Sequence, residues 1–421
     1  MTTKRAPFPP GGMNWDDLEA EMQGRSARDV DWRAGRTPLF VFQSDEETYE
    51  IGRKAYFRFF TENALGRKRA FFGIASMERD VLDFGLSLFN APEGADAAFT
   101  TGGSESVFLA MKAARDAHRA KGPGFGPGSG RLNVVMPITA HPAFDKAADV
   151  LDLELRRGTL RDDKRADPES LRPLVDERTI ALVGSAPCFP HGVVDPIDEL
   201  SRLAQDLGIW LHVDACVGGW LAPFFTRIGR ATKPFDFRYP GVRSISADLH
   251  KFGFCPKPAS TLFYRDTEDM SRASFVSDSW PNGRFETVTL AGTRPGGAVA
   301  GAWAVLNHLG ESGYCRIAGR LAAMTDRYVA GIEAIPGLKM IADPDLSIIN
   351  YGSDEVDMFQ VAEALSERGW LPGLTREPKG LHAMMSLLHE PACDPFLADL
   401  RRAVESVRGA GREGAKIKAT Y

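Results

Sequence analysis

The order of apolar and polar residues predicts a central region in which strands and helices alternate. A helical pattern covers residues 107–120, and Asp195 followed by proline marks the start of another helix. Four short apolar runs suit buried strands, at residues 132–136, 179–184, 209–213 and 260–264. This alternation is typical of the α/β class, in which helices cover a mainly parallel sheet.

The N-terminal part of the chain is predicted to be helical. Asn14 caps a short helix in which Leu18 and Met22 share a face, and further helical patterns lie at 45–65 and 77–89. We therefore expect an N-terminal arm with helices before the sheet begins.

A smaller α/β domain is predicted at the other end. A long helix over 298–309 follows the glycine-rich turn at 292–297, and a strand near 346–349 and a helix over 356–368 come after it. The expected division is an arm over residues 1–60, a large domain over 61–315 and a small domain over 316–421.

Composition narrows the class of protein. The net charge of −5 argues against a nucleic-acid surface, which needs a basic face. The five cysteines are odd in number and form no CxxC pair, so we expect a reducing compartment and no structural metal site. Without a signal peptide or a run of about 20 apolar residues, the sequence predicts a cytoplasmic protein with no stable membrane anchor.

Lys251 lies in a context that is unusual for a surface lysine. It ends the run SISADLHK, which starts at Ser244, and the apolar Phe252 follows it. Burial there is expected to lower the pKa of the amine, because desolvation disfavours the charged form. A neutral lysine amine can form a Schiff base with an aldehyde. The alternative is an ordinary lysine on the surface.

Asp214 directly follows the predicted strand at 209–213, at the end where open α/β sheets place ligands. A carboxylate there can hold the ring nitrogen of a pyridine cofactor protonated, so that the ring accepts electrons from a breaking bond. Two alternatives remain open: Asp214 caps a neighbouring helix, or it binds a metal together with His212.

Two further segments suit a cofactor that carries a phosphate. The glycine turn in TTGGSES, from Thr100, leads into the helix at 107–120, and backbone amides at such a turn can bind an anion. His141 follows the strand at 132–136, where an imidazole can lie flat on a cofactor ring or can be an ordinary core histidine.

At these positions the sequence resembles the pyridoxal-phosphate enzymes of the group II decarboxylase superfamily, and within it the sphingosine-1-phosphate lyases. The stretch TTGGSES is similar to the family's TSGGTES, and TAHPAFDKAA around His141 is similar to SAHAAFDKAA. The likeness runs from near Pro9 to about Leu388. Further matching stretches are SAPCFPHGVVDPI from Ser185, HVDACVGGW from His212, SISADLHKFGFCPK from Ser244 and AGTRPGG from Ala291.

The resemblance implies the aspartate-aminotransferase-like fold, fold type I, with a seven-stranded type of sheet, and a homodimer with shared active sites. It implies pyridoxal 5'-phosphate (PLP) as cofactor, bound to Lys251, with Asp214 on the pyridine nitrogen and His141 stacked on the ring. The other cofactor-binding residues that it implies are Gly103, Ser104, Ser185, Ala215, Ser246 and His250, with Gly292 and Thr293 reaching the phosphate from the partner subunit.

The function that the resemblance implies is cleavage of the Cα–Cβ bond of a phosphorylated amino alcohol, like sphingosine 1-phosphate, with release of an aldehyde. One alternative is a PLP-dependent decarboxylase, or another enzyme of Cα chemistry, acting on a small amino acid. The other is a non-catalytic protein that binds PLP.

The expected substrate pocket departs from the lyase pattern. Lys257 matches a lysine that lies near the substrate phosphate in lyases, but Phe42 stands where they carry a tyrosine. Residues 63–68 read NALGRK where they carry Asn-Pro-x-His. Arg67 or Lys68 offers a charged donor that can substitute as a phosphate contact.

Overall fold

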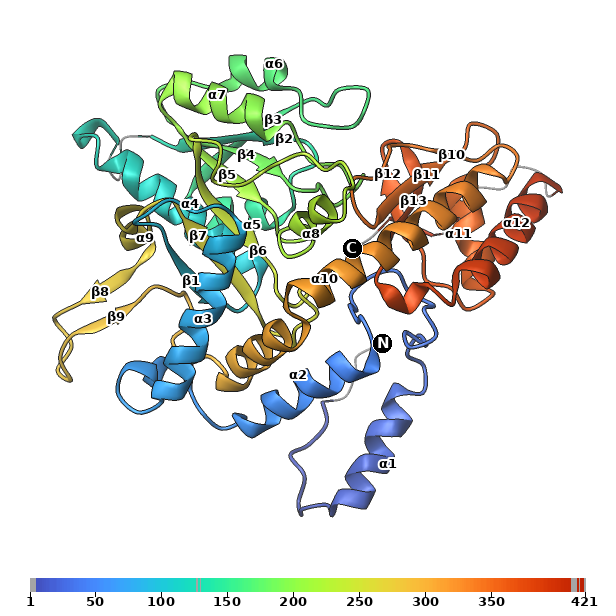
Figure 1. Ribbon diagram of the computed structural model, residues 1–421, viewed down its shortest axis with the longest axis horizontal. Helices are drawn as coiled ribbons and strands as arrows, with labels where there is room; N and C mark the ends of the chain where they lie inside the picture. The colour runs from blue at the N-terminus through green and yellow to red at the C-terminus, as the bar shows by residue number, and fades with distance from the viewer. Residues whose placement is uncertain (1–4, 126–127, 129, 410–414, 416, 420–421) are drawn as a thin grey trace.

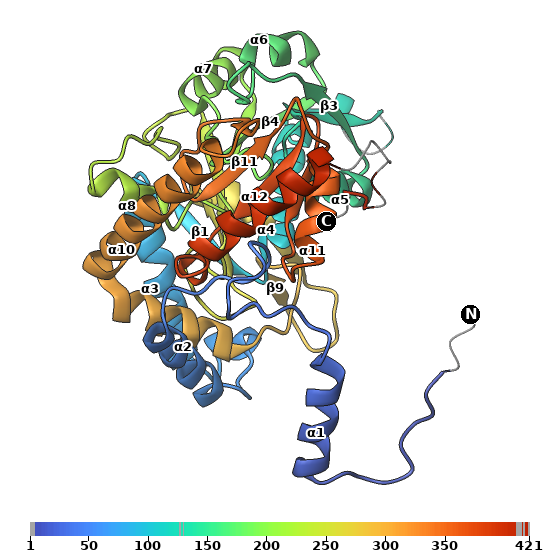
Figure 2. The same ribbon diagram turned by 90° about the vertical axis from the view of Figure 1, so that its right-hand side faces the viewer.

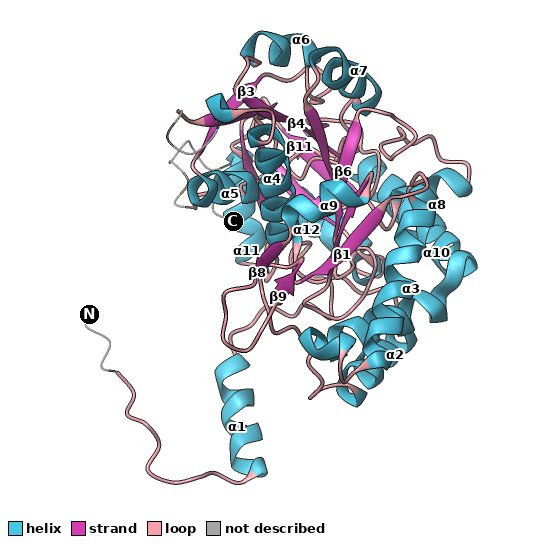
Figure 3. Cartoon of the chain, turned by 90° about the vertical axis from the view of Figure 1, so that its left-hand side faces the viewer, coloured by secondary structure: helices cyan, strands magenta, loops and turns pink. Residues whose placement is uncertain are grey.

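A seven-stranded sheet lies at the centre of the molecule, with helices on both of its faces (Figure 1, Figure 3). The computed structural model describes residues 5–125, 128, 130–409, 415 and 417–419. In sheet order, the strands are β1 (Asp96–Thr100), β7 (Ser260–Tyr264), β6 (Val242–Ala247), β5 (Trp210–Asp214), β4 (Thr179–Ser185), β2 (Leu132–Pro137) and β3 (Leu153–Gly158).

Most neighbouring strands of this sheet run parallel, which confirms the mainly parallel sheet expected from the sequence. The parallel pairs join β3, β2, β4, β5 and β6, whereas β7 is antiparallel to both of its neighbours, β6 and β1. The apolar runs predicted four of the seven strands. They did not predict β3, whose sequence LELRRG is polar because this strand lies at the sheet edge with half-exposed side chains.

Successive residues of the central strands enter two separate hydrophobic cores. In β2, Val134 and Met136 belong to the core that includes α4 and α5, whereas Val135 belongs to the core on the other face. Because side chains alternate between the faces of a strand, a strand covered on both sides reads as a continuous apolar run.

The helices are α1 (Trp15–Ser26), α2 (Glu46–Arg58), α3 (Phe72–Leu88), α4 (Gly103–Arg119), α5 (Ala143–Leu151), α6 (Pro168–Leu171), α7 (Ile197–Leu207), α8 (Ala222–Arg227), α9 (Thr267–Ala273), α10 (Gly296–Glu333), α11 (Met358–Ser366) and α12 (Cys393–Gly409), with short 3₁₀ helices at Ala64–Lys68, Pro123–Phe125, Arg172–Leu174 and Leu387–His389.

Two predicted helix starts are present, for different reasons. The Asn14 side chain accepts a hydrogen bond from the Asp17 amide at 3.0 Å and so caps α1. Helix α7 does begin after Pro196, but the Asp195 carboxylate does not cap it. Instead that buried carboxylate accepts the amides of Ala166 at 2.7 Å and Ser185 at 2.8 Å, which ties the end of β4 to the chain before α6.

The C-terminal unit is built on a second, antiparallel sheet. Helix α10 runs from the large sheet to this unit and is interrupted at Gly310, where φ is 52° (Figure 1). The domain boundary expected near residue 315 lies inside α10. The strands of the small sheet, in order, are β10 (Lys339–Met340), β11 (Ile348–Gly352), β13 (Lys379–Met384) and β12 (Gly373–Arg376), and α11 and α12 accompany them.

The first part of the N-terminal arm, with helix α1, extends away from the rest of the chain, whereas α2 packs against α10. Helix α1 has no buried residue and stands off the body of the molecule (Figure 2). A two-stranded hairpin, β8 (Phe275–Ser277) with β9 (Phe285–Thr287), also projects from the large domain (Figure 1). None of the described helices combines the length and the apolar character that crossing a bilayer requires.

Helix α3 approaches the sheet closely at Gly85. A methyl group added there would collide with the ring of Phe263 on β7, which is fully buried and has no room to move. We therefore expect Gly85→Ala to destabilise the fold by about 1–3 kcal/mol through overpacking. A Cβ atom added at Gly73 in the same helix would have no atom within 4 Å, so Gly73→Ala is the matched control. Denaturant unfolding measures both variants, and equal stabilities would contradict this packing.

Candidate active site

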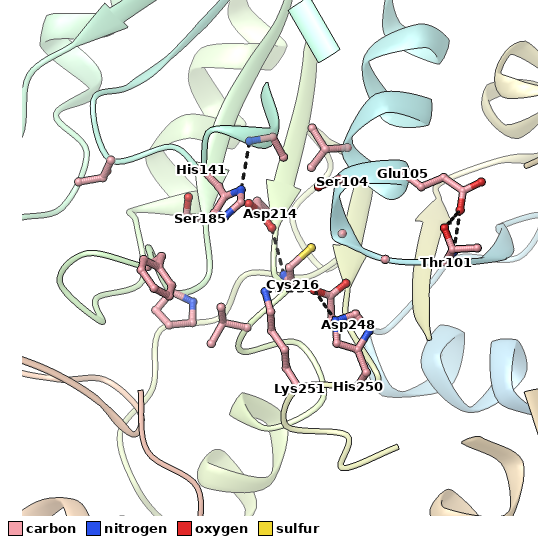
Figure 4. Close-up of a pocket in the computed structure, with 18 residues that line it drawn as sticks. Thr101, Ser104, Glu105, His141, Ser185, Asp214, Cys216, Asp248, His250 and Lys251 are labelled. Carbon is pink, nitrogen blue, oxygen red and sulfur yellow. Dashed lines mark hydrogen bonds and ion pairs between the residues drawn. The ribbon is translucent and has the colours of Figure 1, made fainter. Parts of the chain in front are cut away.

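A pocket of about 420 Å³ opens at the carboxyl ends of β4, β5 and β6, beside the N-terminus of α4. The carboxyl ends of parallel strands meet at one edge of a sheet, which is where ligands bind in open α/β folds. Figure 4 shows Lys251, Asp248, Asp214 and His141 around this pocket. Seven residues expected at the cofactor site line it together: Gly103, Ser104, His141, Ser185, Asp214, His250 and Lys251.

The Lys251 amine is held by a carboxylate that the sequence analysis did not single out. Its Nζ lies 3.1 Å from Oδ2 of Asp248, and only 18% of the lysine side chain and 2% of the aspartate side chain are exposed. His250 Nε2 lies 3.7 Å from the same oxygen. Asp248 therefore contacts both the Lys251 amine and the His250 imidazole, and burial lowers the pKa of that imidazole.

This ion pair corrects the expectation that burial leaves Lys251 neutral. Burial does lower the pKa of the amine, but the Asp248 and Asp214 carboxylates raise it more, so the pKa lies above its ordinary value. The opposite charge next to the lysine outweighs its desolvation. In the absence of a bound aldehyde, Lys251 is therefore a buried ammonium.

Asp214 ends β5 and is 8% exposed. Its Oδ1 accepts hydrogen bonds from the Cys216 amide at 3.1 Å and from the Ser246 hydroxyl at 3.3 Å. These bonds fix the orientation of the carboxylate at the back of the pocket. Ser246 and Ala215 are themselves fully buried behind the pocket wall, so the structure places them beside Asp214 and not in the cavity.

The metal alternative for His212 and Asp214 has no support in the described part of the chain. No group of three or more possible His, Cys, Asp or Glu ligands is present there. His212 instead contacts the hydroxyls of Ser244 at 2.8 Å and Ser246 at 3.3 Å, and burial lowers its pKa to about 4.

His141 lies on the wall of the pocket, between β2 and α5. Its Nδ1 accepts the Ala143 amide at 3.1 Å, which fixes the ring at the start of the helix. Burial lowers the pKa of His141, and the nearby Asp214 offsets only part of that effect. A neutral imidazole is thus expected at neutral pH.

The first turn of α4 forms a concave backbone at the pocket edge. A Cβ atom on Gly103 would lie 2.8 Å from Sγ of Cys216 and about 3 Å from the Asp248 carboxylate, so only glycine fits there. Gly103 and Ser104 begin the helix, where backbone amides and the helix dipole favour an anion. His250 lines the same end of the pocket.

The remaining expected residues lie outside this pocket. Phe42 packs edge-on against Phe252, with the ring centroids 5.0 Å apart, and Lys257 Nζ donates to the carbonyl of Phe40 at 2.5 Å. Within this chain, Gly292 and Thr293 do not line the cavity, and Thr293 is exposed.

The two candidate phosphate contacts in NALGRK differ in their surroundings. Arg67 Nε lies 3.2 Å from the buried carboxylate of Glu78, and this acid also pairs with Arg294 at 3.2 Å. Arg67 is therefore engaged elsewhere in this chain, whereas Lys68 is exposed to solvent. Neither residue reaches the cavity from its own subunit.

Sequence reasoning missed two residues of the pocket, Asp248 and Glu105, and only Asp248 carried a signal in the sequence. Asp248 stands three residues before Lys251 at the end of a strand, so its side chain had to face the same cavity edge. Glu105 lies within TTGGSES, but its partners are far away in the sequence and no local pattern identifies them.

Comparison with known proteins identifies the class that this fold and site define. The family model for the pyridoxal-dependent decarboxylase conserved domain matches residues 73–352. A sphingosine-1-phosphate lyase from Oryza sativa subsp. japonica is 35% identical over 97% of this chain and 76% of its own length. A probable L-tyrosine/L-aspartate decarboxylase from Methanothrix thermoacetophila is 37% identical over 86% of this chain and 90% of its own length.

A solved structure is similar over nearly the whole chain. The sphingosine-1-phosphate lyase of Burkholderia pseudomallei superimposes with a TM-score of 0.90 and 32% identity, covering 97% of this chain and 94% of that protein. The fold is therefore the expected PLP fold type I. The chain belongs to the pyridoxal-dependent decarboxylase family, and its cofactor is pyridoxal 5'-phosphate.

The residues of the pocket fit this cofactor. Its aldehyde needs a lysine amine, its ring nitrogen needs an acid, and its phosphate needs amide donors at a close backbone approach. Lys251, Asp214 and the glycine turn at Gly103 offer these three groups around one cavity.

The ion pair predicts how the reactivity of Lys251 depends on pH. Because the Asp248 carboxylate raises the pKa of the amine, Asp248→Asn should lower it. The neutral amine then forms at lower pH, so the midpoint for the rate of cofactor loading should move to lower pH. The growth of visible cofactor absorbance in a pH series measures this shift. Asp149→Asn, exposed on α5, is the control, and an unchanged or higher midpoint in Asp248→Asn would contradict the account.

Proposed function

We propose that this protein is a PLP-dependent carbon–carbon lyase that cleaves the Cα–Cβ bond of a phosphorylated amino alcohol similar to sphingosine 1-phosphate. One observation carries the choice of substrate. A second lysine, Lys257, lies outside the cavity, where its Nζ donates to the carbonyl of Phe40, and burial together with the charge of Lys251 lowers its pKa. Because the first turn of α4 is proposed to bind the cofactor phosphate, a separate cation whose pKa responds to the charge of Lys251 suits a phosphate on the substrate.

Three residues are proposed to act on the cofactor. Lys251 binds its aldehyde, Asp214 keeps a proton on its ring nitrogen, and His141 covers one face of the ring with a neutral imidazole. When bound, the cofactor accepts the electron pair released at the substrate α-carbon. Gly103, Ser104, Ser185, His250 and the buried Ala215 and Ser246 are proposed to shape or bind its site.

Lys251 has a second task once the substrate amine takes its place. In this structure its Nζ lies 3.1 Å from Oδ2 of Asp248, and the released amine would hold a proton beside that carboxylate. From there it can donate that proton to the substrate α-carbon after an aldehyde has left. The bond at the substrate α-carbon that is held perpendicular to the cofactor ring is the one that breaks. In this proposal, the contact of the substrate phosphate with Lys257 orients the substrate so that the Cα–Cβ bond takes that position.

A PLP-dependent amino-acid decarboxylase is the second candidate. The identity to the archaeal decarboxylase is as high as the identity to the lyases, and Phe42 removes the hydroxyl that the lyase pattern carries. In that case the bond to the substrate carboxylate breaks, while Lys251, Asp214 and His141 keep their roles.

We also propose a homodimer with shared active sites. The N-terminal helices leave large apolar side chains in solvent, among them Phe57 (60% exposed), Phe60 (64%) and Phe72 (67%), and exposed apolar surface of this kind marks protein interfaces. In this proposal the Gly292–Thr293 turn completes the phosphate site of the partner subunit, and Arg67 or Lys68 serves there too. The five free thiols suit the cytoplasm as its compartment.

Product analysis separates the two candidate functions. With sphingosine 1-phosphate, the purified holoenzyme is expected to release a fatty aldehyde and phosphoethanolamine, and Lys251→Ala is expected to lose this activity. Chromatography of the aldehyde checks both. Release of carbon dioxide from tyrosine, aspartate or glutamate, without any aldehyde from the lipid, would select the decarboxylase and contradict the lyase.

The role of Lys257 is tested by binding and turnover together. Lys257→Met should raise the KM for a phosphorylated substrate by about ten- to a hundredfold, since a charge-assisted phosphate contact is lost. Cofactor loading at Lys251 should be unchanged. Lys54→Met, an exposed lysine on α2, serves as the control. An unaltered KM with the phosphorylated substrate would contradict a contact between Lys257 and the substrate phosphate.

A further inference from the structure

The Glu105 carboxylate joins two segments that lie about 185 residues apart in the sequence. It belongs to the first turn of α4 and is 8% exposed. Its Oε2 accepts both the amide and the hydroxyl of Thr101, each at 2.6 Å. Its Oε1 accepts the amides of Leu290 at 2.8 Å and Ala291 at 3.2 Å. Four donors thus converge on one buried carboxylate.

Each of these segments leads directly into a proposed phosphate contact. Thr101 precedes the glycine turn at Gly103 and Ser104, and Ala291 precedes Gly292 and Thr293. Figure 4 shows Glu105 turned toward Thr101, on the side of the α4 turn that faces away from Lys251. Glu105 is among the residues that line the cavity, and its carboxylate is placed to hold the α4 turn from the side opposite Lys251.

Hydrogen bonds within the segment that Glu105 binds also stabilise it as a loop. The hydroxyl of Thr287 donates to the carbonyl of Thr289 at 3.1 Å, and the hydroxyl of Thr289 donates to the carbonyl of Ala291 at 2.8 Å. On the far side of the turn, Arg294 donates to the carbonyl of Phe99 on β1 at 2.9 Å. The Gly292–Thr293 turn thus stands between two anchors, both attached to the corner between β1 and α4.

This turn points outward from its own subunit. Thr293 is exposed, Leu290 is 65% exposed, and neither lines the pocket of this chain. A fixed, outward turn beside exposed apolar side chains suits contact with a second copy. The hydrogen bonds of Glu105 and Arg294 thus connect the cofactor site of one subunit with a surface turn that is offered to the partner subunit.

We propose that Glu105 is a positioning residue that couples the phosphate cradle of its own subunit to the Gly292–Thr293 turn offered to the partner subunit. The proposal rests on the proposed homodimer with shared sites. Its consequence is that Glu105 acts on two cofactor sites at once, its own through Thr101 and the partner's through Leu290 and Ala291. Charged acceptors make stronger hydrogen bonds than neutral ones, so a glutamine cannot replace it well.

Mixed dimers with one working site test this coupling. Subunits carrying two different affinity tags are co-expressed and the mixed species is purified. The reference dimer pairs an unchanged subunit with Lys251→Ala, so that only one Lys251 remains. The first test dimer carries Glu105→Gln in the subunit that keeps Lys251. The second carries Glu105→Gln in the Lys251→Ala subunit, so that the working site keeps its own Glu105 and receives its turn from the altered partner.

The measured quantity is the PLP concentration that gives half-maximal labelling of the remaining lysine after borohydride reduction. We expect both test dimers to need at least about tenfold more PLP than the reference dimer. Glu93→Gln, an exposed carboxylate placed in the same two positions, should leave the value unchanged. A second test dimer that matches the reference would overturn the coupling, because Glu105 would then act only within its own subunit.

A folding defect and a failure of the proposed function give different experimental results. Glu105→Asp is the second variant, for use if Glu105→Gln does not fold. Its carboxylate keeps the charge but is too short to reach all four donors. The PLP concentration for half-maximal labelling should therefore rise at both sites. A general loss of stability would instead lower the unfolding temperature of the apo-dimer without a selective change in PLP concentration, and that result would also overturn the proposal. An unlabelled reference dimer, or a protein that remains monomeric, would overturn the proposed function itself.

Discussion

The site depends on a lysine ammonium that is buried between two carboxylates at the mouth of a sheet. Lys251 Nζ lies 3.1 Å from Asp248, and Asp214 contributes its field from the end of the neighbouring strand. A buried charge without a partner is very costly, so the pair with Asp248 is what permits a lysine at this depth. The same pair keeps the amine protonated until an aldehyde competes for it. The Lys251–Asp248 contact therefore affects both the cost of burying the lysine and the protonation of its amine.

The sheet explains why these groups meet. Strands β4, β5 and β6 run parallel, so Ser185, Asp214 and the chain after Ala247 reach the same edge although they are far apart in the sequence. The first turn of α4 closes that edge, and the close contact of Gly103 with Cys216 and Asp248 leaves no space for a side chain. Ser185 and Asp214 end strands and Gly103 begins α4, whereas His141, His250 and Lys251 lie in the turns that follow β2 and β6. Glu105 connects the first turn of α4 to the chain before Gly292.

Four strands of the large sheet, β2, β4, β5 and β7, were predictable because they are covered on both faces and read as apolar runs, whereas the central strand β6 and the edge strand β1 were not predicted. The edge strand β3 was not predicted either, since its exposed side chains make the sequence polar. The candidate cofactor residues stood out because they lie at or after strand ends in unusual contexts, as Asp214 and Lys251 do. The pKa of Lys251 was predicted in the wrong direction, because its sign depends on the distance to Asp248. Likewise, the engagement of Arg67 by Glu78 depends on packing between helices that a linear pattern does not contain.

The central claim is that one amine, Lys251, carries the cofactor. Borohydride reduction of the purified yellow protein, followed by peptide mapping, tests it directly. The account predicts that a single pyridoxyl group remains covalently attached to the peptide containing Lys251. Labelling of any other lysine, with Lys251 unmodified, would contradict it.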